Sequence, residues 1–434
     1  MKNYILKWLI IIWAFTILFM PNAIRFVSIL YSVDADSYVS ENLWINQHAW
    51  LHYSFSYLEV FSVLTAIFLK LDDKHINIRP IVLLIIGINI IRFLASMTNM
   101  FQFNDYSLLL SLLSGYGCYL LLTSSKIANI DIEDLLDSII IFNTITQFMF
   151  IFTGRQMEYG GRYGALGSDV GSVGVICSQY LIYFIFCRNS KKRSLLVLTC
   201  CLISLILSGS RSNLLFAVFF IVVFVFRLHK SCKANSQTSR AIGILALIIL
   251  LFTPIISTVF VESNISTVFD RMLGILKAIS MDNKGYFESD GSMVGRLMSF
   301  NAGLAILADN PFGISASTID LQMETIKNGY VSFPHSTMLS YYLLWSVATA
   351  VIYFYIIKWI IRAIKEGKRV WIFLLYFLIT SIIYGGPVVN AKNYFWYLLM
   401  FTYCRNNILG INESKQKLYG KSNSIVSSSI PSHT

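Results

Sequence analysis

Residues 195–226 read LLVLTCCLISLILSGSRSNLLFAVFFIVVFVF, and this stretch decides the class of fold. Two long apolar runs flank the small and polar segment 208–213, where Arg211 is the single charged residue of the stretch. Solid apolar runs are typical of membrane-spanning helices, because the strands of membrane barrels alternate apolar and polar side chains. The stretch therefore predicts two spans, 195–209 and 213–227, joined by a tight turn.

The composition of the whole chain points to the same class. Of its 434 residues, 56% are hydrophobic and 13% are charged, whereas roughly 25% are charged in a soluble domain. A span needs about 20 mostly apolar residues, so the chain has room for about a dozen. The seven cysteines lie in or beside apolar runs, without a Cys-x-x-Cys pair. These features exclude a soluble enzyme, a disordered chain and a secreted disulfide scaffold.

We predict an all-α polytopic membrane protein with about 12 transmembrane helices. The transmembrane domain covers residues 1–411, and a disordered cytoplasmic tail rich in Ser, Lys and Asn covers 412–434. The other predicted spans are 4–20, 52–69, 80–97, 107–123, 136–152, 171–187, 241–260, 337–357, 370–384 and 394–404.

The distribution of charge predicts which ends face the cytoplasm. With both termini in the cytoplasm, 23 of the 34 lysines and arginines fall on the inner side, as the positive-inside rule requires. The net charge of +11 is therefore interpreted as topology and contact with anionic membrane lipids, not as nucleic-acid binding.

One external loop, residues 261–336, is much longer than the others. Long connections without a role are uncommon. Within it, 292–308 is predicted to be an amphipathic helix with Met293, Leu297, Leu304 and Leu307 along its apolar side, ended by the turn at 309–313. Such a helix would lie on the membrane surface or pack over the spans.

Arginines beside glycines and serines are the first candidates for chemistry. Arg211 lies at the outer end of two spans, where a guanidinium group offers a rigid fork that fits phosphate oxygens. Arg155 and Arg162 flank Gly160 and Gly161 on another outer loop. The alternatives are a tight turn with a snorkelling arginine at Arg211 and an ordinary flexible loop around the other two.

Two further candidates belong to the long loop. Arg296 lies early in the predicted amphipathic helix, and His335 follows Pro334 at the start of the span 337–357. A histidine there can act as a base, an acid or a hydrogen-bond donor near neutral pH. A solvated helix charge and a structural histidine are the alternative interpretations.

Other charged groups are less specific. Glu59 and Arg92, in the second and third predicted spans, could form an ion pair or have a function. We find no convincing metal constellation and no nucleotide-binding motif, so we expect no metal and no cofactor, and a nucleotide-driven pump is disfavoured.

Four stretches in order resemble the O-antigen polymerase and O-antigen ligase family of bacterial surface-polysaccharide assembly. They are Arg162-Tyr163-Gly164, Ser208-Gly209-Ser210-Arg211, Arg296 followed by Asn310-Pro311-Phe312-Gly313, and Pro334-His335-Ser336. The resemblance covers about residues 150 to 360 and implies a fold similar to multi-helix, lipid-linked glycosyltransferases.

The resemblance implies metal-independent transfer of a glycan from an undecaprenyl-diphosphate carrier, at the outer face of the bacterial inner membrane. Arg211, Arg296, Arg162 and Arg155 would bind the diphosphate, with Arg211 and His335 as catalytic residues. Further implied partners are membrane lipids and the chain-length regulator and flippase of the same O-antigen, lipopolysaccharide, capsule or exopolysaccharide pathway.

Departures from the ligase pattern favour a polymerase. Ser336 stands where that pattern has Asn, and Trp345-Ser346 occupies a region where it has an acidic residue and glycines. The alternatives are a ligase that transfers glycan to lipid A–core and, from another class, a flippase of lipid-linked oligosaccharides. Transporters commonly show repeated halves and midplane sites, whereas the charges of this chain gather at one outer loop.

Overall fold

The structure is a computed structural model, and it describes most of the predicted spans. The described residues are 8–19, 79–97, 103–124, 130–152, 163–165, 170–188, 194–210, 213–214, 216–223, 291–327, 334–383 and 391–409. The predicted spans 52–69 and 241–260 and the tail 412–434 lie outside these residues. Every element that the described part of the chain forms is an α-helix.

Most predicted spans in the described ranges are helices, with ends within a few residues of the prediction. They are the helix Trp8–Phe19, α4 (Arg79–Met97), α5 (Phe103–Thr123), α6 (Ile132–Phe152), α7 (Val170–Phe186), α8 (Leu195–Leu207), α17 (Val370–Ile383) and α18 (Ala391–Ile408). The predicted span 213–227 is described in part, as helix, over 213–214 and 216–223.

The predicted span 337–357 is wrong as a single helix. It is divided into α15 (Thr337–Trp345) and α16 (Val347–Lys365) by Ser346, whose φ of 44° lies in a region that non-glycine residues rarely adopt. Ser346 is held there because its backbone N–H donates to the Tyr342 carbonyl (2.7 Å) and its hydroxyl to the Pro311 carbonyl (3.3 Å). Apolar residues continue across the break, so the sequence gives no sign of it.

Two described helices, α6 and α16, are long and apolar enough to cross a membrane, and six shorter apolar helices accompany them. The structure is therefore compatible with a membrane protein. The number of spans and the side that each end faces stay predictions.

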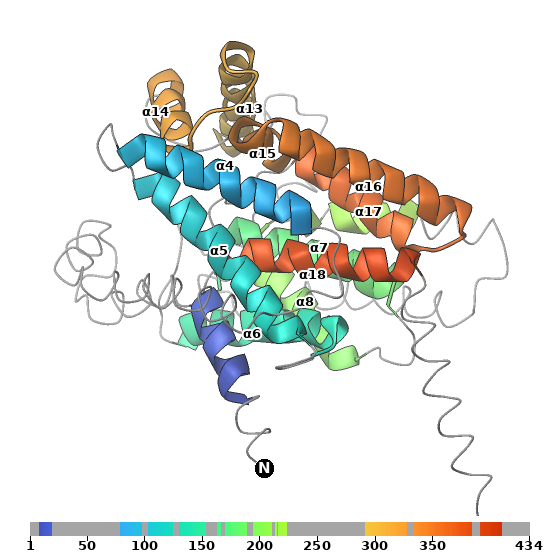
Figure 1. Cartoon of the computed structure of the whole chain (residues 1–434). Coiled ribbons are helices and arrows are strands. Elements are labelled where there is room, and N and C mark those ends of the chain that lie inside the picture. The colour runs from blue at the N-terminus through green and yellow to red at the C-terminus, as the bar shows by residue number, and fades with distance from the viewer. Residues whose placement is uncertain are drawn as a thin grey trace, which may run out of the picture.

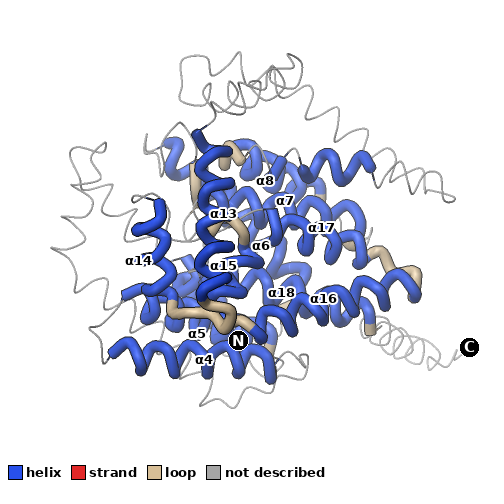
Figure 2. The backbone as a smooth tube through the Cα atoms, turned by 90° about the horizontal axis from the view of Figure 1, so that it is seen from above, coloured by secondary structure: helices blue, strands red, loops and turns tan. Residues whose placement is uncertain are grey.

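Helix α18 lies at the centre of the bundle (Figure 1). It packs against α5, α6, α7, α16 and α17. The remaining two helices, α13 (Gly291–Asp309) and α14 (Ala316–Lys327), stand together at one end of the bundle, beside α15 and near α4 (Figures 1 and 2).

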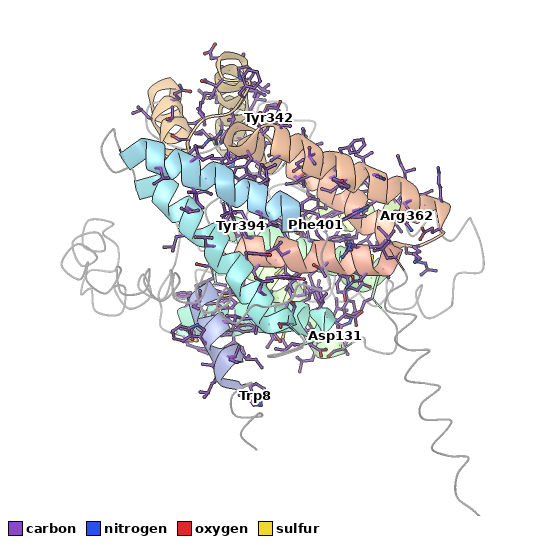
Figure 3. The ribbon with its side chains drawn as sticks, viewed as in Figure 1. Trp8, Asp131, Tyr342, Arg362, Tyr394 and Phe401 are labelled. Carbon is purple, nitrogen blue, oxygen red and sulfur yellow. The ribbon has the colours of Figure 1, made fainter. Side chains whose placement is uncertain are left out.

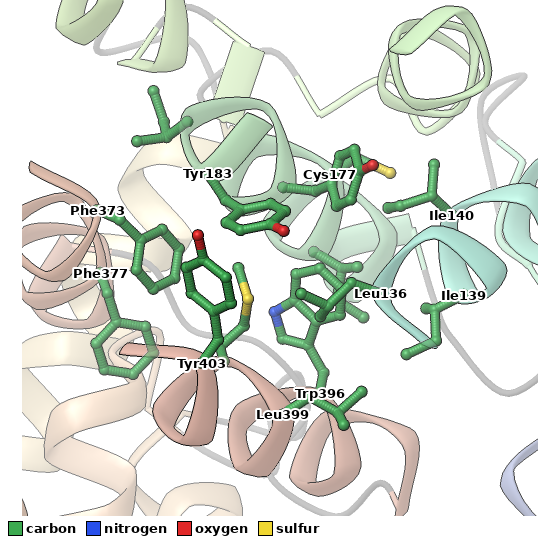
Figure 4. Packing of buried hydrophobic residues seen from close by; sticks show 14 of the residues in the cluster. Leu136, Ile139, Ile140, Cys177, Tyr183, Phe373, Phe377, Trp396, Leu399 and Tyr403 are labelled. Carbon is green, nitrogen blue, oxygen red and sulfur yellow. The ribbon is translucent and has the colours of Figure 1, made fainter. Parts of the chain in front are cut away.

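Large aromatic side chains fill the core around α18 (Figure 4). Trp396 and Tyr403 of α18 meet Tyr183 of α7 and Phe373 of α17, and all four side chains are buried. The indole of Trp396 donates to the Gln179 amide oxygen at 2.9 Å. A buried indole N–H without a partner would be costly, so this bond fixes the rotation of α18 against α7.

Neighbouring helices contact each other at ends that are predicted to face the same side of the membrane. At the predicted cytoplasmic end, Arg188 binds both carboxylate oxygens of Asp137 at 2.6 Å, and Lys368 donates to the Asn407 carbonyl at 2.5 Å. At the predicted outer end, the Asn393 amide of α18 donates to the Ser172 hydroxyl of α7 at 3.1 Å.

The close approach of α5 and α18 depends on a glycine. A Cβ atom at Gly115 would lie 2.7 Å from the Ala391 carbonyl oxygen and 2.9 Å from Tyr394 Cβ, whereas a Cβ at Gly87 of α4 would have no neighbour within 4 Å. Gly87→Ala is therefore a matched control for Gly115→Ala.

We expect Gly115→Ala to lower the melting temperature of the purified protein by several degrees, because α18 must move away from α5. Gly87→Ala should leave it unchanged or raise it, since alanine favours a helix over glycine by about 0.5–1 kcal/mol. Thermal unfolding in detergent measures both, and equal effects of the two variants would contradict this packing.

Candidate active site

The candidate site is built where α13 meets the chain that enters α15. The predicted helix 292–308 is confirmed as α13, and Leu307 of its predicted apolar side packs against the hydrophobic core around α15. Leu297 and Leu304 are 63% and 44% exposed, whereas Ser299, Ala302 and Ile306 are buried. The two small side chains on the buried face, Ser299 and Ala302, allow a close approach to the neighbouring backbone.

Two small residues of α13 make that approach possible. The hydroxyl of Ser299 accepts a hydrogen bond from the backbone N–H of His335 at 3.2 Å. A Cβ at Gly303 would lie 2.6 Å from Pro334 Cγ. Arg296 precedes Ser299 by one helical turn and is half-buried, so it lies on the side of α13 that faces the His335 segment. The structure thus brings together the elements that carry Arg296 and His335.

The segment around His335 is fixed from both directions. The hydroxyl of Ser340 donates to the Pro334 carbonyl at 3.0 Å. Ser336 caps α15 by accepting from the Leu339 N–H, and its hydroxyl lies 3.4 Å from the Ser381 carbonyl of α17. His335 itself is half-buried. Its backbone is therefore held by α13, α15 and α17 together, which is the rigidity that a reacting side chain needs.

The Asn310-Pro311-Phe312-Gly313 turn has a structural role. Gly313 has φ of 78°, and a Cβ there would lie 2.6 Å from the Leu343 carbonyl oxygen, which accepts from the Ile314 N–H at 2.7 Å. Only glycine combines this φ with this approach. The turn therefore attaches the end of α13 to the end of α15.

Arg92 completes the same junction. Its guanidinium donates to the carbonyls of Ile314, at 2.8 Å, and of Leu344 at the end of α15. Nearby, the buried carboxylate of Asp105 accepts from the Ala316 N–H (2.8 Å) and the Ser317 hydroxyl (2.7 Å), at the start of α14. Glu59 lies outside the described residues, so its predicted pairing with Arg92 stays a prediction. The two carbonyl contacts of Arg92 are structural.

Arg155, Arg162 and Arg211 lie outside the described residues. Described neighbours of two of them meet at the end of α8, where the Tyr163 N–H donates to the Leu207 carbonyl at 3.0 Å. The Gln147 amide holds the Tyr163 and Ser204 carbonyls at 2.8 and 3.2 Å. The residue after Arg162 and a residue four before Arg211 are therefore hydrogen-bonded to each other.

The polar turn after α8 is packed against α7. A Cβ at Gly174 would lie 2.5 Å from Ser210 Cβ, and the Asn213 amide donates to the Ser210 hydroxyl at 2.7 Å. Gly209 has φ of 57°, which glycine tolerates without strain. The first residues of this turn, Gly209 and Ser210, therefore have fixed positions, and Arg211 follows them in the sequence.

Sequence reasoning did not single out Lys392, which begins α18. It is wholly buried, its Nζ atom lies 2.5 Å from the Asn143 amide oxygen, and the same atom lies 4.6 Å from the centre of the Phe19 ring. Beside it, the Asn393 amide donates to the Ser172 hydroxyl at 3.1 Å. One pattern in the sequence could have indicated this site: a lysine followed by an asparagine at the start of an apolar span. Buried cations in membrane proteins are costly and usually functional.

No group of three or more His, Cys, Asp or Glu side chains in the described ranges could hold a metal ion. The site offers instead a guanidinium and an imidazole on adjoining elements, with a buried ammonium among the predicted outer helix ends. This chemistry suits the binding of an anion and the transfer of a proton.

A comparison with known protein families finds a match in the middle of the chain. Residues 195–345 match the family Wzy_C, described as O-Antigen ligase. Over this region, about a third of its length, the chain resembles the O-antigen ligase/polymerase family. The matched region begins with α8 and ends with α15, so it includes Arg211, Arg296 and His335. Searches of curated proteins and of solved structures gave no match.

The family and the apolar helices together indicate a membrane protein that handles glycans. Members of the family are glycosyltransferase-like enzymes that act on lipid-linked glycans. The helix break at Ser346 lies directly after the matched region.

Arg92→Leu tests the junction that supports this site. The carbonyls of Ile314 and Leu344 then lose a charged donor, so hydrogen exchange at the Ile314 and Ser346 amides should become at least tenfold faster, equivalent to about 1.4 kcal/mol. Exchange in α6 serves as the internal control and should not change. Unchanged exchange at Ile314 would show that Arg92 does not hold the turn.

Proposed function

We propose that this protein is a polymerase that joins oligosaccharide repeat units carried on undecaprenyl diphosphate. The reaction would take place at the outer face of the bacterial inner membrane, without a metal ion. The observation that supports it best is the contact between the Arg296 face of α13 and the Pro334–His335 segment, within the region that matches the family.

The proposed reaction is a displacement at the anomeric carbon of the donor sugar. The acceptor hydroxyl oxygen forms a bond to that carbon while the bond from the carbon to the diphosphate oxygen breaks. The electron pair leaves with the diphosphate, whose negative charge increases, and the hydroxyl proton is released. The products are a lengthened glycan on the acceptor and a free lipid diphosphate.

Arg296 and Arg211 are proposed to bind the diphosphate. Because charge builds up on the leaving group, fixed guanidinium groups stabilise the transition state more than the ground state. Arg162 and Arg155 are proposed as further ligands of the same group. The hydrogen bond between Tyr163 and Leu207 supports this, since it brings together residues near Arg162 and Arg211.

His335 is proposed to accept the proton of the acceptor hydroxyl. Its backbone N–H is bonded to Ser299, which lies one helical turn from Arg296 on α13. A base must lie close to the hydroxyl that it activates, and an arginine must lie close to the leaving group. Both conditions are met when the sugar lies between the two side chains.

A ligase is the second candidate, because the matching family is described as O-Antigen ligase. The two functions differ in the acceptor: a polymerase uses another lipid-linked unit, and a ligase uses lipid A–core. The chain-length regulator and the flippase of the pathway are proposed partners of either enzyme.

Purified protein, supplied with a synthetic lipid-diphosphate repeat unit, should produce a ladder of products in the presence of a chelator. Transfer to a core acceptor without a ladder would identify a ligase. Movement of the intact substrate across vesicles without a change in its bonds would identify a flippase and contradict both enzymes.

In the same assay, Arg296→Ala and Arg211→Ala should slow transfer by about 100- to 1000-fold, the usual cost of one lost electrostatic contact. His335→Ala should cause a severe loss as well. The exposed neighbour Leu297→Ala is the matched control on α13 and should keep wild-type rates. Activity of His335→Ala within about threefold of wild type, about 0.7 kcal/mol, would make the histidine structural.

A further inference from the structure

A second feature of the bundle is an open groove between α4, α5, α16 and α18, whose cytoplasmic end is far from the residues proposed for catalysis. Its volume is about 680 Å³, within the roughly 300–1,000 Å³ of ligand sites. The lining is mostly apolar and aromatic, and it includes Ile352, Trp359 and Phe401. Such a groove accepts an apolar chain.

The groove extends along most of α16. Tyr341 and Trp345, whose ring centres lie 4.5 Å apart, line one end of the groove. Arg362 and Arg405 line the other end. Thr349 and Arg362 are 13 residues apart on one helix, a rise of about 20 Å. One bilayer leaflet contributes about 15 Å of hydrocarbon. Figure 3 shows the groove residues Tyr394, Phe401 and Arg362 in this order across the bundle.

The end of the groove near Arg362 and Arg405 is strongly basic. Six basic residues, Lys358, Arg362, Lys365, Lys368, Arg369 and Arg405, lie on the last turns of α16, the following turn and α18. Within the described ranges 347–369 and 391–409, Glu366 is the single acidic residue. Arg362 donates to Glu366 at 2.7 Å, and this bond holds the pKa of the Glu366 carboxyl below its usual value. Five positive charges therefore remain in excess at this end.

We infer that this groove binds an anionic phospholipid of the inner leaflet, with its acyl chains along α16 and its phosphate between Arg362 and Arg405. The charge decides the occupant, because the apolar groove leads to a cationic end that the sequence places on the cytoplasmic side. The donor of the proposed reaction carries its diphosphate at the opposite end. The inference is independent of the proposed function, since its site and its readout are different.

The test is lipid binding by the full-length protein in detergent, followed by native mass spectrometry. The probes are phosphatidylglycerol and phosphatidylcholine, which differ in charge and share the same acyl chains. We expect phosphatidylglycerol to bind at least tenfold more tightly. Arg362→Gln with Arg405→Gln should reduce its binding about 25-fold, since each basic side chain near an anionic lipid contributes about fivefold.

Lys358→Gln with Lys365→Gln is the matched control. It removes the same charge from exposed positions of α16 that do not line the groove, so it should change binding by less than threefold. Ile352→Trp, which fills the groove, should weaken the binding of both lipids, whereas Phe354→Trp on an exposed face should not. Melting temperatures confirm that all variants are folded.

Equal binding of the two lipids by the wild type would overturn the inference. Equal losses of phosphatidylglycerol binding in the Arg362/Arg405 and Lys358/Lys365 variants would also overturn it. Binding would then depend on the total positive charge and not on the groove. Displacement of phosphatidylglycerol by equimolar polyprenyl phosphate would assign the groove to a prenyl carrier instead. None of these outcomes bears on the ladder assay, so failure of this inference and failure of the proposed function are distinguishable.

Discussion

The close contact between α13 and the Pro334–His335 segment is the constraint on which the site depends. It exists because Ser299 and Gly303 present almost no side chain where α13 meets α15, so a proline ring and a backbone N–H reach the helix surface. A larger residue at Gly303 would separate the helices and carry Arg296 away from His335. The Gly313 turn and Arg92 hold the far end of the same junction, so α13 is attached at two points.

Elsewhere in the bundle, buried charged side chains are paired or hydrogen-bonded, because little water reaches them. Arg188 is paired with Asp137 at one end, and Lys392 is hydrogen-bonded to Asn143 at the other. Removing one partner of such a pair leaves an uncompensated buried charge, which is more costly than the loss of one exposed ion pair. The basic end of the aromatic groove differs from the core in an important respect, because its charges lie at the surface, within reach of a lipid headgroup.

The sequence predicted most of the described helices because apolar runs of span length are a strong and local pattern. It did not predict the break at Ser346, since the contacts that cause it come from Pro311 and from the fold. It predicted α13, but it did not indicate that Ser299 and Ala302 would be buried while Leu297 and Leu304 are exposed. It named Arg296 and His335 from motifs, yet the contact between the elements that carry them is seen only in three dimensions. It did not predict α14, and it did not single out Lys392.

The most direct test of the account is an experimental structure of the protein with a bound lipid-diphosphate sugar. We expect diphosphate oxygens within about 3 Å of the Arg296 guanidinium, and the His335 imidazole on the sugar side of the bond to be broken. A diphosphate bound more than about 10 Å from both side chains, beyond the range of strong charge pairing, would contradict the central claim.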